Sequence, residues 1–294
     1  MNFPDYPFNS HFLEVNGHKL HYLDEGDKQA EPVVMLHGNP SWSFYYRRLV
    51  TGLKDDYRCI VPDHIGMGLS DKPLKDNYDF HFSQRVKDLS DLLTQLDINE
   101  NITLVLHDWG GMIGMLYACQ NLEKIKRLIV LNTGAFHLPE DKALPFSIRL
   151  GHTPIINSIL VQGLNAFCKG AVKHCVTRPM TPEVARVYLA PYNNWHNRLA
   201  VRKFVEDIPL SPKDRGYDDI SKINHDEPLL QSIPKLICWG MKDFVFDETF
   251  LRKWQSFYPD AEVHRFKNAG HYVLEDAADE IISLARKFLA SNPV

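Results

Sequence analysis

Leu106-His107-Asp108-Trp109-Gly110-Gly111 is the stretch of sequence that decides the fold. The run before it, residues 102–106, is apolar and rich in β-branched side chains, which predicts a buried strand. The run after it, residues 110–125, predicts a helix. A strand, a very short turn and a helix with small residues at the bend make a sharp elbow that presents the side chain at its tip. Asp108 occupies that tip.

The carboxylate at the tip of this elbow restricts the chemistry. A serine there performs acyl transfer through an acyl-enzyme, whereas a carboxylate attacks an electrophilic carbon and holds the fragment as an ester. The chain contains no Gly-x-Ser-x-Gly sequence that would compete for the role. Asp108 is therefore the candidate nucleophile, and serine-type acyl transfer is excluded.

Strand and helix patterns alternate on both sides of the elbow. Near the N-terminus, two strand-like runs flank Asn16-Gly17, a strong hairpin signal. Further strands are predicted over residues 32–37, 57–62, 102–106, 127–131, 235–239 and 262–266, and helices over residues 42–53, 81–96, 110–125, 248–257 and around 281–288. This alternation predicts a mostly parallel sheet of eight strands, and the elbow makes it an α/β-hydrolase fold.

The alternation stops after Gly134 and resumes only near the end of the chain. Residues 135–230 are helix-like, interrupted by prolines and rich in aromatic side chains, and Thr181-Pro182 is a clear helix start. We therefore expect an α/β core built from residues 1–134 and 231–294, with a helical cap inserted over residues 135–230. The cap is expected to cover the carboxyl ends of the strands, where open α/β sheets bind their ligands.

Composition and charge argue against several partners. The 294 residues carry a net charge of −4, which disfavours nucleic acid or an acidic membrane surface. No apolar run is long enough to cross a bilayer, and residues 1–5 lack the features of a signal peptide. The glycines at 66 and 68 belong to no complete dinucleotide-binding motif, so no cofactor is expected.

The cysteines predict neither disulfides nor a metal site. Their number is odd, none forms a Cys-x-x-Cys pair, and their spacing fits no metal motif. Small buried thiols of this kind are typical of a reducing cytoplasm, which is the expected location. The five are Cys59, Cys119, Cys168, Cys175 and Cys238.

Asp243 and His271 are the candidates for the rest of a catalytic triad. In this fold the order along the chain is nucleophile, acid, histidine. Both residues follow predicted strands, so both are expected at the edge of the sheet where Asp108 lies. Asp243 would orient the ring of His271, and His271 would activate water against an ester on Asp108. Taken singly, such an aspartate is commonly a helix cap and a lone histidine is commonly structural.

Asn39 and Trp109 are the candidates for binding a leaving group. The indole N–H of Trp109 only donates hydrogen bonds. Asn39 follows the predicted strand over residues 32–37, in the loop that supplies the oxyanion hole in this fold. Two neutral donors in an apolar pocket suit a halide or a carboxylate oxygen. A role for Asn39 as a turn residue before Pro40 stays open.

Tyr188 and Tyr192 are a weaker candidate pair. They are one helical turn apart in the predicted cap, an arrangement that would suit activation of an epoxide oxygen above Asp108. Pro191 disturbs the helical geometry between them. Packing in the core is the favoured interpretation.

At these motifs the sequence resembles the haloalkane dehalogenases over essentially the whole core. The matching runs are His37-Gly38-Asn39-Pro40, residues 62–73 (PDHIGMGLSDKP) and His107-Asp108-Trp109-Gly110-Gly111. The resemblance implies that Asp108 is the nucleophile, His271 the base, and Asn39 with Trp109 a halide-binding pair. One large dehalogenase subfamily has its acid, a glutamate, after the sixth strand. This chain has Asn132 and no acid there, so the acid is expected to be Asp243.

The cap resembles a related family more closely, the β-lactone decarboxylases of bacterial olefin biosynthesis. The runs that carry this likeness are residues 40–45 (PSWSFY), 190–195 (APYNNW), 207–212 (DIPLSP) and 271–276 (HYVLED). The likeness implies conversion of a small hydrophobic cis-3-alkyl-4-alkyloxetan-2-one into a cis-alkene and CO2 through a covalent intermediate on Asp108. It also implies a cytoplasmic assembly with a β-lactone synthetase and a reductase.

Three reactions stay open at this point. Decarboxylation is favoured by the cap, hydrolytic dehalogenation is the alternative, and epoxide hydrolysis is the weakest. For decarboxylation, attack of Asp108 on the ring C–O carbon and attack on the carbonyl are equally consistent with the sequence.

Overall fold

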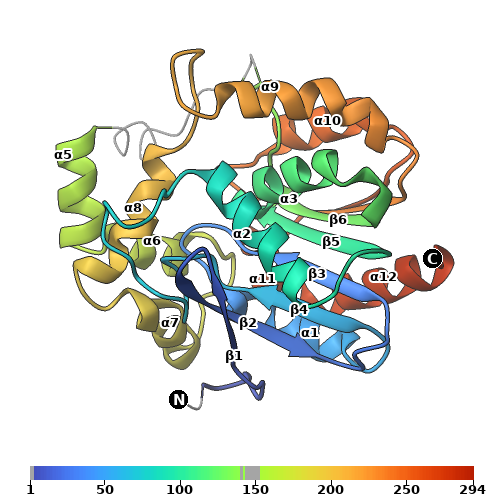
Figure 1. Ribbon diagram of the computed structural model, residues 1–294, viewed down its shortest axis with the longest axis horizontal. Helices are drawn as coiled ribbons and strands as arrows, with labels where there is room; N and C mark the ends of the chain where they lie inside the picture. The colour runs from blue at the N-terminus through green and yellow to red at the C-terminus, as the bar shows by residue number, and fades with distance from the viewer. Residues whose placement is uncertain (1–2, 140–141, 143–152) are drawn as a thin grey trace.

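The structure is a computed structural model that describes residues 3–139, 142 and 153–294. A sheet of eight strands runs through its centre in the order β1-β2-β4-β3-β5-β6-β7-β8 (Figure 1). β1 and β2 form the predicted hairpin, β2 pairs antiparallel with β4, and the other pairs are parallel. The predicted eight-stranded, mostly parallel sheet is confirmed. The strands are β1 His11–Val15, β2 His18–Glu25, β3 Pro32–Leu36, β4 Arg58–Pro62, β5 Ile102–Asp108, β6 Ile125–Thr133, β7 Lys235–Gly240 and β8 Glu262–Phe266.

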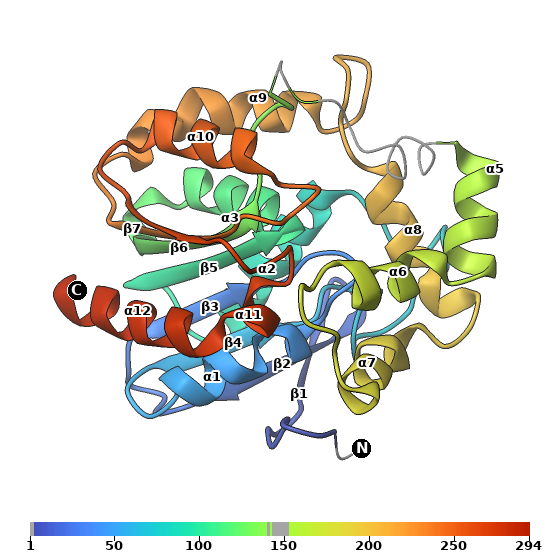
Figure 2. The same ribbon diagram turned by 180° about the vertical axis from the view of Figure 1, so that it is seen from behind.

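Helices cover both faces of this sheet. α1 and α12 lie on one face, and α2, α3, α9 and α10 lie on the other (Figures 1 and 2). The apolar strand residues are buried between the two helical layers, which is where most of the core lies. The helices of the core are α1 Arg47–Leu53, α2 Phe82–Gln95, α3 Trp109–Gln120, α9 Tyr217–Asp226, α10 Glu248–Phe257, α11 Val273–Asp276 and α12 Ala278–Ser291.

The helix predicted over residues 110–125 is too long. α3 ends at Gln120, because Asn121 leaves the helical conformation with φ −141° and ψ 49°. A 3-10 turn, η2 Leu122–Lys124, follows, and Ile125 already pairs with Ile102 in the sheet. The apolar spacing of residues 110–125 gives no indication that Ile125 pairs with β5.

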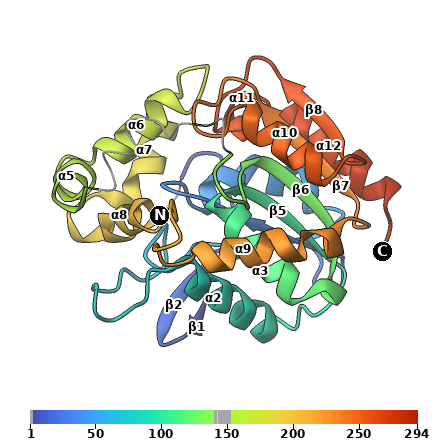
Figure 3. The same cartoon turned by 90° about the horizontal axis from the view of Figure 1, so that it is seen from above.

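The remaining helices gather beside the end of β5 that carries Asp108 (Figure 3). They are α5 Pro154–Asn157, the π-helical turn η3 Ser158–Gly163, α6 Ala166–His174, α7 Pro182–Leu189 and α8 Leu199–Glu206. α9 also falls between residues 135 and 230, but it packs on α3. The division into core 1–134, cap 135–230 and core 231–294 stays a proposal.

Within the described residues no single helix is long and apolar enough to cross a membrane, although Ile155–Gly163 and Ala166–His174, which are bent by 66°, meet the same length and composition as a pair.

Candidate active site

The predicted strand–turn–helix elbow is present at Asp108. β5 ends on this residue and α3 starts at the next one, so the chain reverses within a single residue at φ 51° and ψ −124°. Two glycines make the close approach of α3 possible. A Cβ on Gly110 would lie 2.0 Å from the carbonyl oxygen of Leu36, and one on Gly111 would lie 1.9 Å from Oγ1 of Thr133. Only glycine fits at these two positions, which explains the small residues after the nucleophile.

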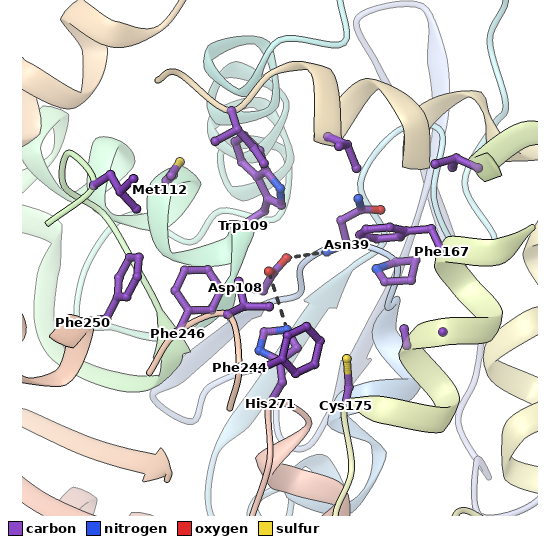
Figure 4. A pocket seen from close by; sticks show the side chains of 18 of the residues that line it. Asn39, Asp108, Trp109, Met112, Phe167, Cys175, Phe244, Phe246, Phe250 and His271 are labelled. Atoms are coloured by element: carbon purple, nitrogen blue, oxygen red, sulfur yellow. Dashed lines mark hydrogen bonds and ion pairs between the residues drawn. The ribbon is translucent and has the colours of Figure 1, made fainter. Parts of the chain in front are cut away.

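The two oxygens of the Asp108 carboxylate have different surroundings. Oδ1 accepts the backbone N–H of Asn39 at 2.6 Å, and the backbone N–H of Trp109 is near enough to favour the charged carboxylate. Oδ2 lies 3.6 Å from Nε2 of His271 (Figure 4). Burial raises the pKa of Asp108, and the charge of His271 and the two N–H groups offset part of that effect. Oδ1 is therefore held by a backbone hydrogen bond, while Oδ2 faces His271.

The three predicted triad residues lie together. Nδ1 of His271 is 2.8 Å from Oδ2 of Asp243, so the proton on this nitrogen points to Asp243 and Nε2 points to Asp108. Oδ1 of Asp243 accepts the backbone N–H groups of Val245 and Phe246 at 2.7 and 3.1 Å. Burial lowers the pKa of His271, but the charge and hydrogen bond of Asp243 outweigh it, so the pKa is raised overall.

Asn132 has a role that the sequence did not reveal. The sequence shows only that Asn132 stands where one dehalogenase subfamily has its glutamate. In the structure its Nδ2 donates to Oδ2 of Asp243 at 3.0 Å and to the carbonyl of Gly240, and its Oδ1 accepts the N–H of Gly240. The side chain is fully buried between β6 and β7. Asn132 therefore orients the carboxylate of Asp243, and its only sequence signal is a polar residue at the end of an apolar strand.

Trp109 and Asn39 both line the cavity above Asp108 (Figure 4). The Trp109 ring packs on Phe204 and Phe82, which fixes its plane, and within the described residues no hydrogen bond occupies its indole N–H. The Asn39 amide is partly committed, since Nδ2 donates to the carbonyl of Val201 in α8 at 3.0 Å. One N–H of that amide remains for a ligand. The structure also gives Asn39 a task that was not predicted, because its backbone N–H holds the nucleophile.

The cavity above these residues has a volume of about 700 Å³. Its wall is mostly apolar, and the cap contributes much of it from η3, α6 and the segment after α8. Asp108 and His271 lie at its base (Figure 4). A cavity of this size and lining suits an apolar ligand with its reacting group at the base. Its apolar wall includes Leu160, Val161, Phe167, Ala171, Ile208, Phe244, Phe246 and Phe250.

Tyr188 and Tyr192 do not lie over Asp108. The hydroxyl of Tyr188 donates to Oε1 of Glu275 at 2.5 Å, and that of Tyr192 donates to the carbonyl of Ser41 at 3.0 Å. Neither residue lines the cavity, and both are buried. The interpretation as core residues is confirmed, and the pairing over Asp108 that epoxide hydrolysis requires is wrong.

The Tyr188 contact belongs to a buried network that the sequence did not predict. Arg47 of α1 pairs with both oxygens of Glu275 in α11, at 2.5 and 2.9 Å. Tyr188 also stacks on Tyr272, the residue after His271. This network joins α7 to the segment that carries His271.

The part of the chain that the structure describes contains no group of three or more His, Cys, Asp or Glu side chains arranged to hold a metal ion.

Comparison with known proteins first defines the class. Residues 31–154 match the family model described as alpha/beta hydrolase fold. A haloalkane dehalogenase from Paraglaciecola agarilytica has a similar structure, with a TM-score of 0.80, 28% sequence identity and coverage of 98% of this chain and 94% of that one. Together with the sheet and the elbow, these matches confirm the α/β-hydrolase fold, in an enzyme with a dehalogenase-like scaffold.

Two closer relatives then define the family. The cis-3-alkyl-4-alkyloxetan-2-one decarboxylase of Shewanella oneidensis is 54% identical over 97% of this chain and 90% of its own length. The decarboxylase of the same name from Xanthomonas campestris is 45% identical over the full length of both. The chain belongs to this family of β-lactone decarboxylases. The resemblance to the β-lactone decarboxylases is confirmed.

Proposed function

We propose that the protein converts a cis-3-alkyl-4-alkyloxetan-2-one into a cis-alkene and CO2, with Asp108 as the nucleophile. The names of its two close relatives support this substrate. The observation that carries the proposal is the placement of the Asp108 carboxylate in the lining of an apolar cavity, with Oδ1 held by the backbone N–H of Asn39 and Oδ2 3.6 Å from Nε2 of His271.

The first step is displacement at the ring carbon that bears oxygen. Oδ2 of Asp108 forms a bond to this carbon, the C–O bond of the ring breaks, and its electrons remain on the released carboxylate. In the second step the bond between this carboxylate and the adjacent carbon breaks to give CO2. Its electrons form the alkene, and Asp108 leaves with the electrons of the ester bond. Inversion followed by anti elimination preserves the cis geometry of the lactone.

The other candidate residues serve the carboxylate that appears in the first step. Trp109 and Asn39 supply neutral N–H donors where a halide leaves in a dehalogenase, and an apolar wall strengthens such contacts. No water is consumed, so His271 has no hydrolytic task. Burial lowers the pKa of His271, but the charge and hydrogen bond of Asp243 raise it more. His271 therefore acts as a cation that keeps the buried carboxylate of Asp108 ionised.

An isotope experiment tests the first step. A lactone labelled with ¹⁸O at the ring oxygen releases the label in CO2 when Asp108 attacks the ring carbon. Attack at the carbonyl leaves that oxygen on the carbon as an alkoxide, so CO2 without label contradicts the mechanism. Turnover of unlabelled lactone in ¹⁸O-water should leave Asp108 unlabelled, whereas label in Asp108 indicates hydrolysis.

A parallel assay separates decarboxylation from dehalogenation. The enzyme is incubated with a cis-dialkyl β-lactone and with a bromoalkane, and alkene and bromide are measured together. Alkene from the lactone and no saturable bromide release are expected. The opposite pattern rejects the proposal.

We also propose that the protein works in the cytoplasm beside other enzymes of olefin biosynthesis. The class of reaction that must supply its substrate is closure of a β-lactone ring. Co-purification of a tagged protein with a β-lactone synthetase from the same cell is the expected result, and a protein that purifies alone under these conditions contradicts the assembly.

A further inference from the structure

The outer face of the cap carries an exposed apolar patch. Ile155, Ile159 and Leu164 are 75%, 54% and 59% exposed, and they lie on α5, on η3 and directly after η3. Trp195, which is 54% exposed, lies beside them, because a Cβ on Gly163 would be 3.7 Å from its ring. We call these four residues the cap patch. Exposed side chains of this size, when clustered, mark an interaction surface.

The charge around the cap patch differs from that of the whole chain. Residues 153–182 contain three basic residues and no aspartate or glutamate. At the average frequency of the chain, 37 acidic residues in 294, a segment of this length would hold about four. Lys169 is exposed, and its Nζ donates to the carbonyl of Leu164 at 3.2 Å. Lys173 is exposed one turn further along α6. The segment that carries three of the four patch residues is therefore basic, although the whole chain has a net charge of −4.

We infer that the cap patch docks on the surface of an anionic phospholipid bilayer, with α5, η3 and α6 lying along the membrane. Leucine, isoleucine and tryptophan flanked by lysine are the composition of helices that bind the membrane interface, where tryptophan lies at the level of the headgroups. The local positive charge is complementary to anionic lipid and unsuited to a basic partner. This surface reverses the expectation drawn from the net charge alone.

The same helices cannot cross the bilayer while the protein is folded. Their opposite face is occupied, because Val161, Cys168 and Ala171 are buried and residues of η3 and α6 line the cavity. The helices therefore lie on the membrane with one face in lipid and the other around the cavity. If the proposed function holds, this arrangement separates the apolar substrate from the bilayer by only one helix layer.

Vesicle flotation tests the inference. The full chain is mixed with vesicles of about three parts phosphatidylethanolamine to one part phosphatidylglycerol, and with vesicles of phosphatidylcholine alone. Flotation with the anionic vesicles is expected, with weaker binding as salt is raised. The variant Ile155→Ser/Ile159→Ser/Leu164→Ser should bind at least tenfold more weakly, since each apolar side chain contributes about tenfold to transfer from water.

A matched control distinguishes the patch from general apolarity. Leu74 and Leu229 are 60% and 59% exposed elsewhere on the molecule, so Leu74→Ser/Leu229→Ser should bind as the unmodified protein does. Lys169→Glu/Lys173→Glu should remove the preference for anionic vesicles. Equal loss in the control variant, or no flotation of the unmodified protein, overturns the inference. The inference is also overturned if the chain binds no vesicles but binds another protein through the cap patch. Because the assay measures binding only, its outcome is independent of the proposed reaction.

Discussion

Replacing Asn132 by aspartate tests the description of the triad. Asn132→Asp keeps the shape of a fully buried side chain but puts a second carboxyl group 3.0 Å from Oδ2 of Asp243. Two charges at that separation repel by about 5–6 kcal/mol at an effective dielectric constant of 20. Keeping the new carboxyl protonated at pH 7 costs less, about 4 kcal/mol, since its unperturbed pKa is about 4. The group therefore takes up a proton, and the variant is less stable by about 4 kcal/mol at pH 7.

The pH dependence follows from the sign of this shift. The folded state raises the pKa of the new carboxyl above its unfolded value, so the protonation penalty is absent below about pH 4 and grows by about 1.4 kcal/mol per pH unit above it. Urea unfolding of variant and unmodified protein, followed by tryptophan fluorescence, should show about 3 kcal/mol less destabilisation at pH 5 than at pH 7. Asn132→Ala is the control, with a loss that does not depend on pH. The reasoning is refuted if the loss in free energy of unfolding caused by Asn132→Asp is the same at every pH between 5 and 8.

Four further results are expected. Asp108→Asn should lower alkene release by at least roughly a thousandfold without lowering the melting temperature, because burial already disfavours the charged form; residual turnover within tenfold contradicts a covalent role. Gly38→Ala should lower kcat by about a hundredfold, because its Cβ would lie 2.0 Å from Oδ1 of Asp108; normal kcat in the purified variant refutes this. Tyr188→Phe should cost about 1–2 kcal/mol in urea unfolding and leave alkene formation intact, since the hydroxyl serves Glu275. Burial raises the pKa of Asp108 above its ordinary value of 3.8, so the rate should fall in acid as this carboxylate takes up a proton. The pKa of His271 is raised above its ordinary value of 6.5, so the rate should fall again in alkali as the ring loses its proton. A rate that rises through neutral pH and then stays level identifies His271 as a base.

The candidate site was predictable because its residues lie at the ends of strands. Apolar runs identify parallel strands, and the carboxyl ends of such strands meet at one edge of the sheet. Asp108 and Asp243 lie at the ends of apolar runs and His271 follows the strand predicted over residues 262–266, so three positions distant in sequence converge. The error in the helix bounds concerns a contact that no local pattern indicates, because pairing of Ile125 with Ile102 ends the helix early. The buried position of Tyr188 was the favoured interpretation, but its hydrogen bond to Glu275 could not be predicted from the sequence.

The sequence by itself predicted the fold class, a candidate carboxylate nucleophile and the likeness to the β-lactone decarboxylases, because periodicity, turn chemistry and motifs are local properties of the chain. Only the tertiary structure decided which oxygen of Asp108 the backbone holds, what Asn132 orients, and which face of the cap is exposed. Each of these depends on where a side chain points, and that direction is set by partners far away in the chain. Asn132, for example, meets Gly240 across 108 positions.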